Sequence, residues 1–217
     1  MFELNKLYLI DCMKGMTQFP DKYFDLAIVD PPYGIGESGQ TNKTRSCMAK
    51  SKDYGNKNWD NYPPDELYFK ELDRISKDRI IWGCNNFIEY LTNTTSLIVW
   101  DKDNGDNDFA DCEVAWTSHS CAVRKFRFKW HGMLQENMKN KEVRVHPTQK
   151  PVQLYKWILH NYAKPDFKII DTHAGSCSSV IAFFDFGCEW IAFEIDKDYY
   201  EAASRRIEIH KQQLKLF

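Results

Sequence analysis

Short runs of buried-type residues alternate with segments of helical spacing along most of the chain. Helices are expected where apolar residues recur every three or four positions, and strands where short β-branched or aromatic runs lie between turn residues. These patterns predict strands at residues 7–11, 24–30, 80–82, 97–100, 168–171 and 190–194. They predict helices at residues 65–75, 86–91, 152–162, 178–186 and 199–214. This order is typical of an α/β protein with a largely parallel sheet.

Two further segments, residues 113–117 and 124–130, alternate apolar and polar positions. A period of two is typical of strands with one face in solvent, and we expect these segments to pair as an antiparallel ribbon. Alternation places Lys125, Arg127 and Lys129 on one side of the second strand. The predicted fold is a Rossmann-like, doubly wound α/β sheet of about seven strands, mostly parallel.

The chain of 217 residues fits one domain, and we expect residues 1–217 to form it without a linker. Residues 34–62 are polar, glycine-rich and without a period, which predicts a long functional loop. The apolar runs are too short to span a bilayer, and the N-terminus lacks the features of a signal peptide. We therefore expect a cytoplasmic protein without a membrane partner.

Cysteine spacing and charge restrict the function further. No two of the seven cysteines are spaced C-x-x-C, so we expect neither a disulfide framework nor a metal site. The formal net charge of −2 does not indicate a nucleic-acid partner, but residues 43–57 and 121–150 are locally basic. Such segments are either solvated surfaces or phosphate contacts. The candidates for phosphate contacts are Lys43, Arg45, Lys125, Arg127 and Lys129.

The sequence Asp30-Pro31-Pro32-Tyr33 directly follows a predicted strand, where open α/β sheets bind ligands. Because prolines favour extended backbone and donate no N–H, this stiff turn offers only acceptors, the Asp30 carboxylate and the Pro31 carbonyl. Two preorganised acceptors beside an aromatic ring can hold the exocyclic amine of a flipped base and make its nitrogen more nucleophilic. The tetrapeptide alone is equally compatible with an ordinary Asp-initiated turn.

A second candidate site follows the strand at residues 168–171. The next residues, Thr-His-Ala-Gly-Ser, are mostly small, so backbone N–H groups and a helix N-terminus can approach a ligand carboxylate. The following strand ends at Glu194, a position where an acid commonly binds ribose hydroxyls. The G-x-G-x-x-G pattern of nicotinamide cofactors is absent. Any α/β crossover could show the remaining features.

Taken in order, these motifs resemble the beta-class, circularly permuted DNA amino-methyltransferases, especially phage-type adenine-N6 enzymes with a DPPY motif. The resemblance rests on the Asp30 turn, residues 80–85 and 99–102, the box His146-Pro147-Thr148-Gln149-Lys150-Pro151, and residues 171–179 and 194–196. It covers nearly the whole chain and implies the class I S-adenosylmethionine methyltransferase fold. Glutamine methyltransferases of proteins use a similar turn, but their cofactor strand precedes the catalytic one, whereas here it follows.

The resemblance also implies a role for each residue. Asp30 and the Pro31 carbonyl would hold the target amine, Pro32 would stiffen the turn, and Tyr33 would stack on the base. The residues implied for S-adenosylmethionine are Asp11 near the adenine, Glu194 at the ribose, Thr148 and Lys150 at the carboxylate, and, around the methionine moiety, Asp171, Ala174, Gly175, Ser176, Cys177 and Ser178. Asp30 is implied as a cofactor contact as well, and His173 either packs on the cofactor or is an ordinary turn residue.

The implied activity is direct methyl transfer to N6 of adenine in DNA, in a restriction-modification or phage setting. Two alternatives stay open: N4-cytosine methylation, in which Ser more often replaces Asp30, and a degenerate DNA-binding subunit. The second is motivated by the cofactor turn, where Cys177 places a side chain at a usual glycine position and is expected to reduce affinity. Residues 131–145 are a minimal target-recognition segment. Specificity is therefore expected to be short, or to come from loop 34–62, a specificity partner or a second copy.

Overall fold

The computed structural model describes residues 2–36, 57, 59–105, 110–131 and 134–214, and its centre is an eight-stranded sheet. The strand order is β1-β10-β9-β2-β3-β5-β4-β6. The strands are β1 (Lys6–Leu9), β2 (Phe24–Val29), β3 (Ser76–Trp82), β4 (Leu97–Asp101), β5 (Cys112–Thr117), β6 (Arg124–Arg127), β9 (Lys168–Asp171) and β10 (Glu189–Glu194). The short strands β7 (Trp130–His131) and β8 (Leu134–Gln135) form a separate antiparallel pair.

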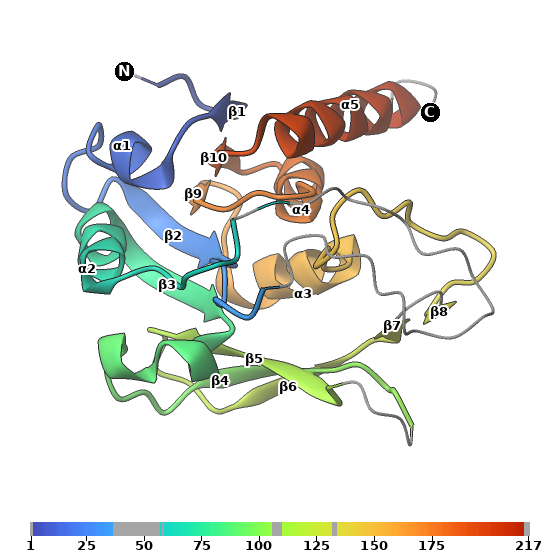
Figure 1. Cartoon of the computed structure of the whole chain (residues 1–217), viewed down its shortest axis with the longest axis horizontal. Coiled ribbons are helices and arrows are strands. Elements are labelled where there is room, and N and C mark those ends of the chain that lie inside the picture. The colour runs from blue at the N-terminus through green and yellow to red at the C-terminus, as the bar shows by residue number, and fades with distance from the viewer. Residues whose placement is uncertain (1, 37–56, 58, 106–109, 132–133, 215–217) are drawn as a thin grey trace.

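Helices cover both faces of this sheet (Figure 1). The helices α1 (Cys12–Met16) and α2 (Glu66–Ile75) lie on one face, and α3 (Val152–Tyr162), α4 (Ser178–Phe186) and α5 (Lys197–Leu214) lie on the other. Asp65 starts α2 by accepting the Tyr68 N–H, and Gly187 ends α4 with a φ of 82°. The mostly parallel, doubly wound sheet confirms the predicted fold class.

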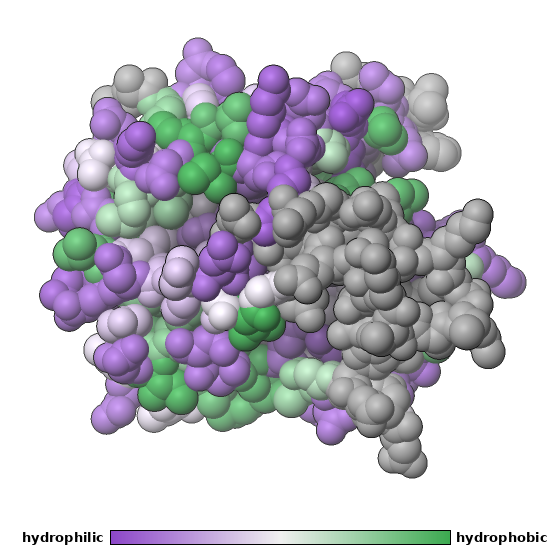
Figure 2. Space-filling view, in the orientation of Figure 1, coloured by the Kyte–Doolittle hydropathy of each residue, from purple (hydrophilic) through white to green (hydrophobic). Residues whose placement is uncertain are grey.

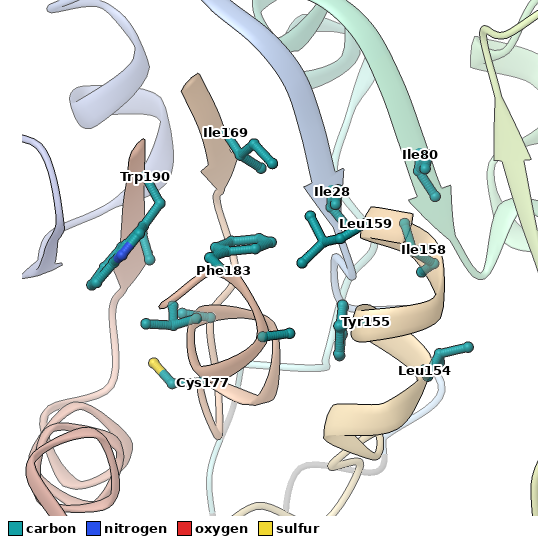
Figure 3. Close-up of a cluster of buried hydrophobic side chains, with 14 of the residues drawn as sticks. Ile28, Ile80, Leu154, Tyr155, Ile158, Leu159, Ile169, Cys177, Phe183 and Trp190 are labelled. Atoms are coloured by element: carbon teal, nitrogen blue, oxygen red, sulfur yellow. The ribbon is translucent and has the colours of Figure 1, made fainter. Parts of the chain in front are cut away.

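The core divides along the faces of β2. Because side chains alternate along a strand, Leu26 and Ile28 pack toward α3 and α4, while Ala27 and Val29 pack toward α1 and α2. Figure 3 shows Ile28 beside Leu159 of α3, with Phe183 of α4 filling the space next to them. Burial on both faces explains the nearly continuous apolar sequence of this strand.

The predicted antiparallel ribbon is wrong in its pairing. Both segments form strands, but β5 lies between β3 and β4 and is antiparallel to each, while β6 is parallel to β4 at the sheet edge. The alternating pattern determines which side chains face the core. It does not determine which strand lies alongside, and here β4 takes the place between β5 and β6.

The predicted helix at residues 86–91 is also wrong. Two 3-10 turns, Cys84–Asn86 and Ile88–Tyr90, replace it. Phe87 between them has a φ of −133°, outside the helical region, and its fully buried ring lies against Phe69 of α2. Burial of this ring therefore outweighs the weak helical pattern of a short segment.

The other predicted elements are present, with ends shifted by a few residues in several cases. Hydrophilic and hydrophobic residues are intermixed on the face shown in Figure 2. Within the described part of the chain, no helix is long and apolar enough to cross a membrane. Most of loop 34–62, including the candidates Lys43 and Arg45, lies outside the described residues.

Candidate active site

A cavity of about 250 Å³ lies at the carboxyl ends of four adjacent parallel strands, β1, β10, β9 and β2. Each strand contributes a wall to it: Asp11 follows β1, Glu194 ends β10, residues 172–176 follow β9, and Asp30 follows β2. This is the edge of an α/β sheet at which ligands bind. The topology thus brings together residues from both ends of the chain.

The turn after β9 is held in place by two buried carboxylates. Glu194 accepts the N–H of Gly175 at 2.8 Å, and also that of Asp196 at 2.8 Å. Asp171 lies below the turn, where it accepts the His173 N–H at 3.0 Å and the Ser179 hydroxyl at 2.5 Å. Asp171 is 2% exposed and does not line the cavity, so it supports the turn from beneath. Burial raises the pKa of Asp171 to about 7.

The expectation for Cys177 is wrong in its structural basis. Cys177 has a φ of 58°, in the left-handed region, and is fully buried in the core between α4 and the sheet (Figure 3). It is not among the residues lining the cavity, whereas Ala174, Gly175, Ser176 and Ser178 are. The side chain therefore leaves the space beside the turn open to a ligand.

The remaining wall carries further predicted residues. Asp11 caps α1 by accepting the Lys14 N–H at 3.1 Å, and it lines the cavity at the end of β1. His173 and Cys12 also line the cavity, and the Cys12 sulfur is 3.7 Å from His173 Nε2. Burial lowers the pKa of His173 to about 4, so this ring is neutral at physiological pH.

The box at residues 146–151 forms a compact turn before α3 and closes the cavity. The His146 ring contacts the rings of Trp59 and Tyr199, with centroids 4.9 Å and 4.3 Å away, and Thr148 Oγ1 is 3.1 Å from His146 Nδ1. Burial lowers the pKa of His146 to about 3. Arg206 of α5 donates to the Ser176 carbonyl at 2.8 Å, which fixes the cofactor turn from the far side.

The acceptor turn stands where the sequence predicts it, directly after β2. Asp30 Oδ1 accepts the Tyr33 hydroxyl at 2.6 Å, and Oδ2 lies 2.5 Å from Lys150 Nζ. Burial raises the pKa of Asp30, against the opposing effect of the Lys150 ammonium. A second, smaller cavity of about 30 Å³ touches Asp30, Pro31, Pro32 and Tyr33. Asp30 and Pro32 thus line both cavities.

The Tyr33 ring depends on Gly83 for its position. Gly83 has a φ of 67°, and a Cβ atom added there would overlap the Tyr33 ring. The ring also packs edge-on against Phe87, with centroids 6.1 Å apart. A glycine after β3 therefore lets the aromatic side chain pack closely against the backbone.

Lys150 lines the large cavity and also belongs to a chain of alternating charges. Besides Asp30, its ammonium lies 3.0 Å from Glu113 Oε2, and Glu113 Oε1 lies 2.6 Å from Lys102 Nζ. The side chain of Lys150 is only 3% exposed. Burial opposes ionisation of Glu113, but the two ammonium groups outweigh it and hold the pKa of Glu113 at about 2.

The described candidates for phosphate contacts lie along β6 and just after it. Lys125 is 3.3 Å from Asp101, Arg127 pairs with Asp103, and Lys129 is 3.2 Å from the same carboxylate. The side chains point away from Phe126 and Phe128, which pack against the core as expected. Two acids thus offset part of the positive charge of this strand.

Glu113 and several cavity-lining residues, among them Trp59 and Tyr155, were not predicted as site residues. Tyr155 is an apolar position of the predicted helix 152–162, and Glu113 is a polar position of an alternating strand. Trp59, in the long loop, lines both cavities. A lone tryptophan in a polar segment was the available signal for a ligand-facing residue.

Comparison with known proteins agrees with this geometry. The sequence pattern of the DNA methylase family N6_N4_Mtase matches residues 24–205, so the chain belongs to this family. It is 24% identical over 249 residues to the type II methyltransferase M.HinfI of Haemophilus influenzae, covering 94% of this chain and 68% of that protein. It is 23% identical over 236 residues to M2.MboI of Moraxella bovis, covering 92% and 86%.

Solved structures show the same fold at low sequence identity. The M1.HpyAVI–SAM complex superposes with a TM-score of 0.60 at 17% identity, covering 93% of this chain and 98% of that one. The cytosine-N4-specific PvuII DNA methyltransferase superposes with a TM-score of 0.61 at 13% identity, covering 93% and 85%. The fold is that of the class I S-adenosylmethionine-dependent methyltransferases, and S-adenosylmethionine is the cofactor of the DNA methylase family.

Proposed function

We propose that this chain transfers a methyl group from S-adenosylmethionine to the exocyclic N6 of adenine in DNA. The observation that carries the proposal is the position of Asp30, whose carboxylate lines both the large and the small cavity at the end of β2. A methyl donor in the large cavity and a base in the small one would meet at this side chain.

The large cavity suits the cofactor chemically. Each oxygen of Glu194 accepts one backbone N–H, and since a carboxylate offers about four acceptor sites, two remain for the ribose hydroxyls. Asp11, Asp30 and Glu194 line the cavity against one ammonium, that of Lys150, which favours a cationic ligand. When bound, S-adenosylmethionine supplies an electrophilic methyl group on its sulfonium.

The acceptor turn suits the amine. Asp30 and the Pro31 carbonyl offer acceptors to its two hydrogens, and such bonding increases electron density on the nitrogen. The prolines and the Tyr33 hydroxyl hold this arrangement before the reaction. No covalent intermediate with the enzyme is required. As the amine nitrogen bonds to the methyl carbon, the carbon–sulfur bond would break, the thioether S-adenosylhomocysteine would leave, and the surplus proton of the nitrogen would pass to solvent.

Further details of the proposal come from the order of the motifs. The catalytic strand β2 precedes the cofactor strand β9 in the sequence, which supports the beta-class, permuted arrangement. Asp30, rather than Ser, favours adenine over cytosine. The alternative of a degenerate subunit is disfavoured, since the Cys177 side chain lies in the core and leaves the cavity open.

The test is to incubate the purified chain with S-adenosylmethionine and unmethylated DNA, followed by mass spectrometry of the nucleosides. N6-methyldeoxyadenosine is expected, N4-methyldeoxycytidine would support the cytosine alternative, and neither product would contradict methyl transfer. Asp30→Ala should lower the rate about 10²–10³-fold through loss of a preorganised contact. Asp25→Ala, at the opposite end of β2, is the matched control and should retain activity. An Asp30→Ala variant with more than half of the wild-type rate would refute the assignment.

A further inference from the structure

The buried charges near Asp30 form a row that reaches from the acceptor turn to the far half of the sheet. Asp30, Lys150, Glu113 and Lys102 alternate in sign, with successive contacts of 2.5, 3.0 and 2.6 Å. Their side chains are 18%, 3%, 23% and 17% exposed. Ion pairs with so little water interact far more strongly than surface pairs, so each charge affects the next.

Lys150 has two carboxylate partners of unequal importance to the proposed chemistry. Asp30 must accept hydrogen bonds from an amine, and an ammonium that pairs with Asp30 alone weakens the carboxylate as an acceptor. Glu113 holds the same ammonium from the other side and balances its charge. Lys102 in turn fixes the second oxygen of Glu113.

We propose that Glu113 is a positioning residue for methyl transfer, which shares the Lys150 ammonium with Asp30 and so preserves Asp30 as a strong acceptor. This inference rests on the proposed function of the same site. It assigns Lys150 to the acceptor turn rather than to the cofactor carboxylate. Its consequence is that the strand β5, which contributes no cavity-lining residue among those described, controls the reactivity of the turn.

Several titratable groups besides Lys150 and Glu113 face Asp30, so their own titrations must be distinguished from that of Asp30. They are Tyr33 of its own turn, Tyr155 of α3, Tyr68 of α2 and Asp171 at the end of β9. Burial raises the pKa of each of the three tyrosines, so they are neutral through the working range. Asp171 titrates near pH 7 and must be assigned separately from Asp30.

The test compares the wild type with Glu113→Gln, which preserves shape and removes the charge. Because Glu113 raises the pKa of Asp30, its neutralisation should move the Asp30 titration to lower pH. Carboxyl ¹³C NMR of aspartate-labelled protein follows this titration, with Asp30→Asn and Asp171→Asn assigning the signals. The single-turnover rate of methyl transfer should fall about 10–100-fold, less than for a direct contact, and the affinity for S-adenosylmethionine should stay within twofold.

Asp185→Asn is the matched control, because it removes a similarly buried carboxylate from a lysine pair, 2.6 Å from Lys156, away from the site. It should change neither the Asp30 titration nor the rate of methyl transfer. If Glu113→Gln does not fold, the double variant Lys102→Gln/Glu113→Gln, which removes one charge of each sign, carries the same expectation.

An unmoved Asp30 titration overturns the inference, and so does a wild-type transfer rate in the folded variant. If the wild type itself transfers no methyl group, the proposed function fails, while the NMR titration still decides whether Glu113 controls Asp30.

Discussion

Replacement of Gly83 by Ala tests the acceptor turn at a residue that itself lines neither cavity. A non-glycine residue at a φ of 67° costs roughly 1–2 kcal/mol, and forcing a methyl group into the Tyr33 ring adds about 1–3 kcal/mol. The expected loss of about 2–5 kcal/mol lowers the melting temperature by about 4–20 °C in a chain of this size. The ring must also move, which breaks the 2.6 Å bond between the Tyr33 hydroxyl and Asp30. Methyl transfer should therefore fall about 10²–10³-fold.

Gly105 provides the matched control for this prediction. It has the same φ of 67°, but an added Cβ would meet no atom of the described residues within 4 Å. Gly105→Ala should therefore cost only the backbone term of roughly 1–2 kcal/mol and retain full activity. Thermal unfolding, calorimetric titration with S-adenosylmethionine and single-turnover transfer are measured for both variants. If Gly83→Ala has the same melting temperature as Gly105→Ala and transfers methyl groups at the wild-type rate, the role given to the packed Tyr33 ring is refuted.

Three further predictions concern the cofactor turn, the strand β6 and pH. Glu194→Ala should weaken S-adenosylmethionine binding by about 1–3 kcal/mol, because two backbone N–H groups lose their acceptor; an unchanged dissociation constant in calorimetry would contradict this. Neutralising Lys125, Arg127 and Lys129 together should lower the number of ions released on DNA binding by about one to three, since two acids already offset part of their charge. An unaltered dependence of DNA affinity on salt concentration would indicate that this strand is only a solvated surface. Asp171 has a folded-state pKa of about 7, above its unfolded value. The free energy of unfolding therefore receives its largest contribution from Asp171 below pH 4. This contribution falls by up to about 4 kcal/mol as the pH rises to 7. Asp171→Asn should accordingly gain stability relative to the wild type between pH 4 and pH 8, and a constant difference in unfolding free energy would contradict the shift.

The sequence predicts well those elements whose pattern depends on local burial. The helix at 152–162, the strand at 168–171 and the helix at 178–186 occur with the predicted bounds, because their periodicity and flanking turn residues agree. The acceptor turn and Glu194 were likewise predicted, since the turn directly follows a recognisable strand and Glu194 is the last residue of another. The partners of β5 and β6 were not predictable, because alternation defines the buried face of a strand and not its neighbour.

The missed features depend on contacts between distant residues or on backbone conformation. Glu113 is 37 positions from Lys150, and nothing in its own segment distinguishes it from a solvent-facing strand residue. The orientation of the Cys177 side chain follows from the positive φ of this residue. The sequence does not predict that φ, because cysteine seldom adopts the left-handed conformation. For these residues the sequence gives the chemical group, but its contacts depend on the folded structure.

The interleaving of β9 and β10 between β1 and β2 also has a consequence for synthesis of the protein. Translation completes β2 at residue 29 but β10 only at residue 194, and at about 5–20 residues per second these 165 residues take roughly 8–33 s. During that interval the facing edges of β1 and β2 have no partner, a state that favours association with other chains. The growing chain therefore carries its acceptor turn well before it can bind a methyl donor. We expect ribosome-bound chains that end before β9 to bind no S-adenosylmethionine and to need protection from aggregation.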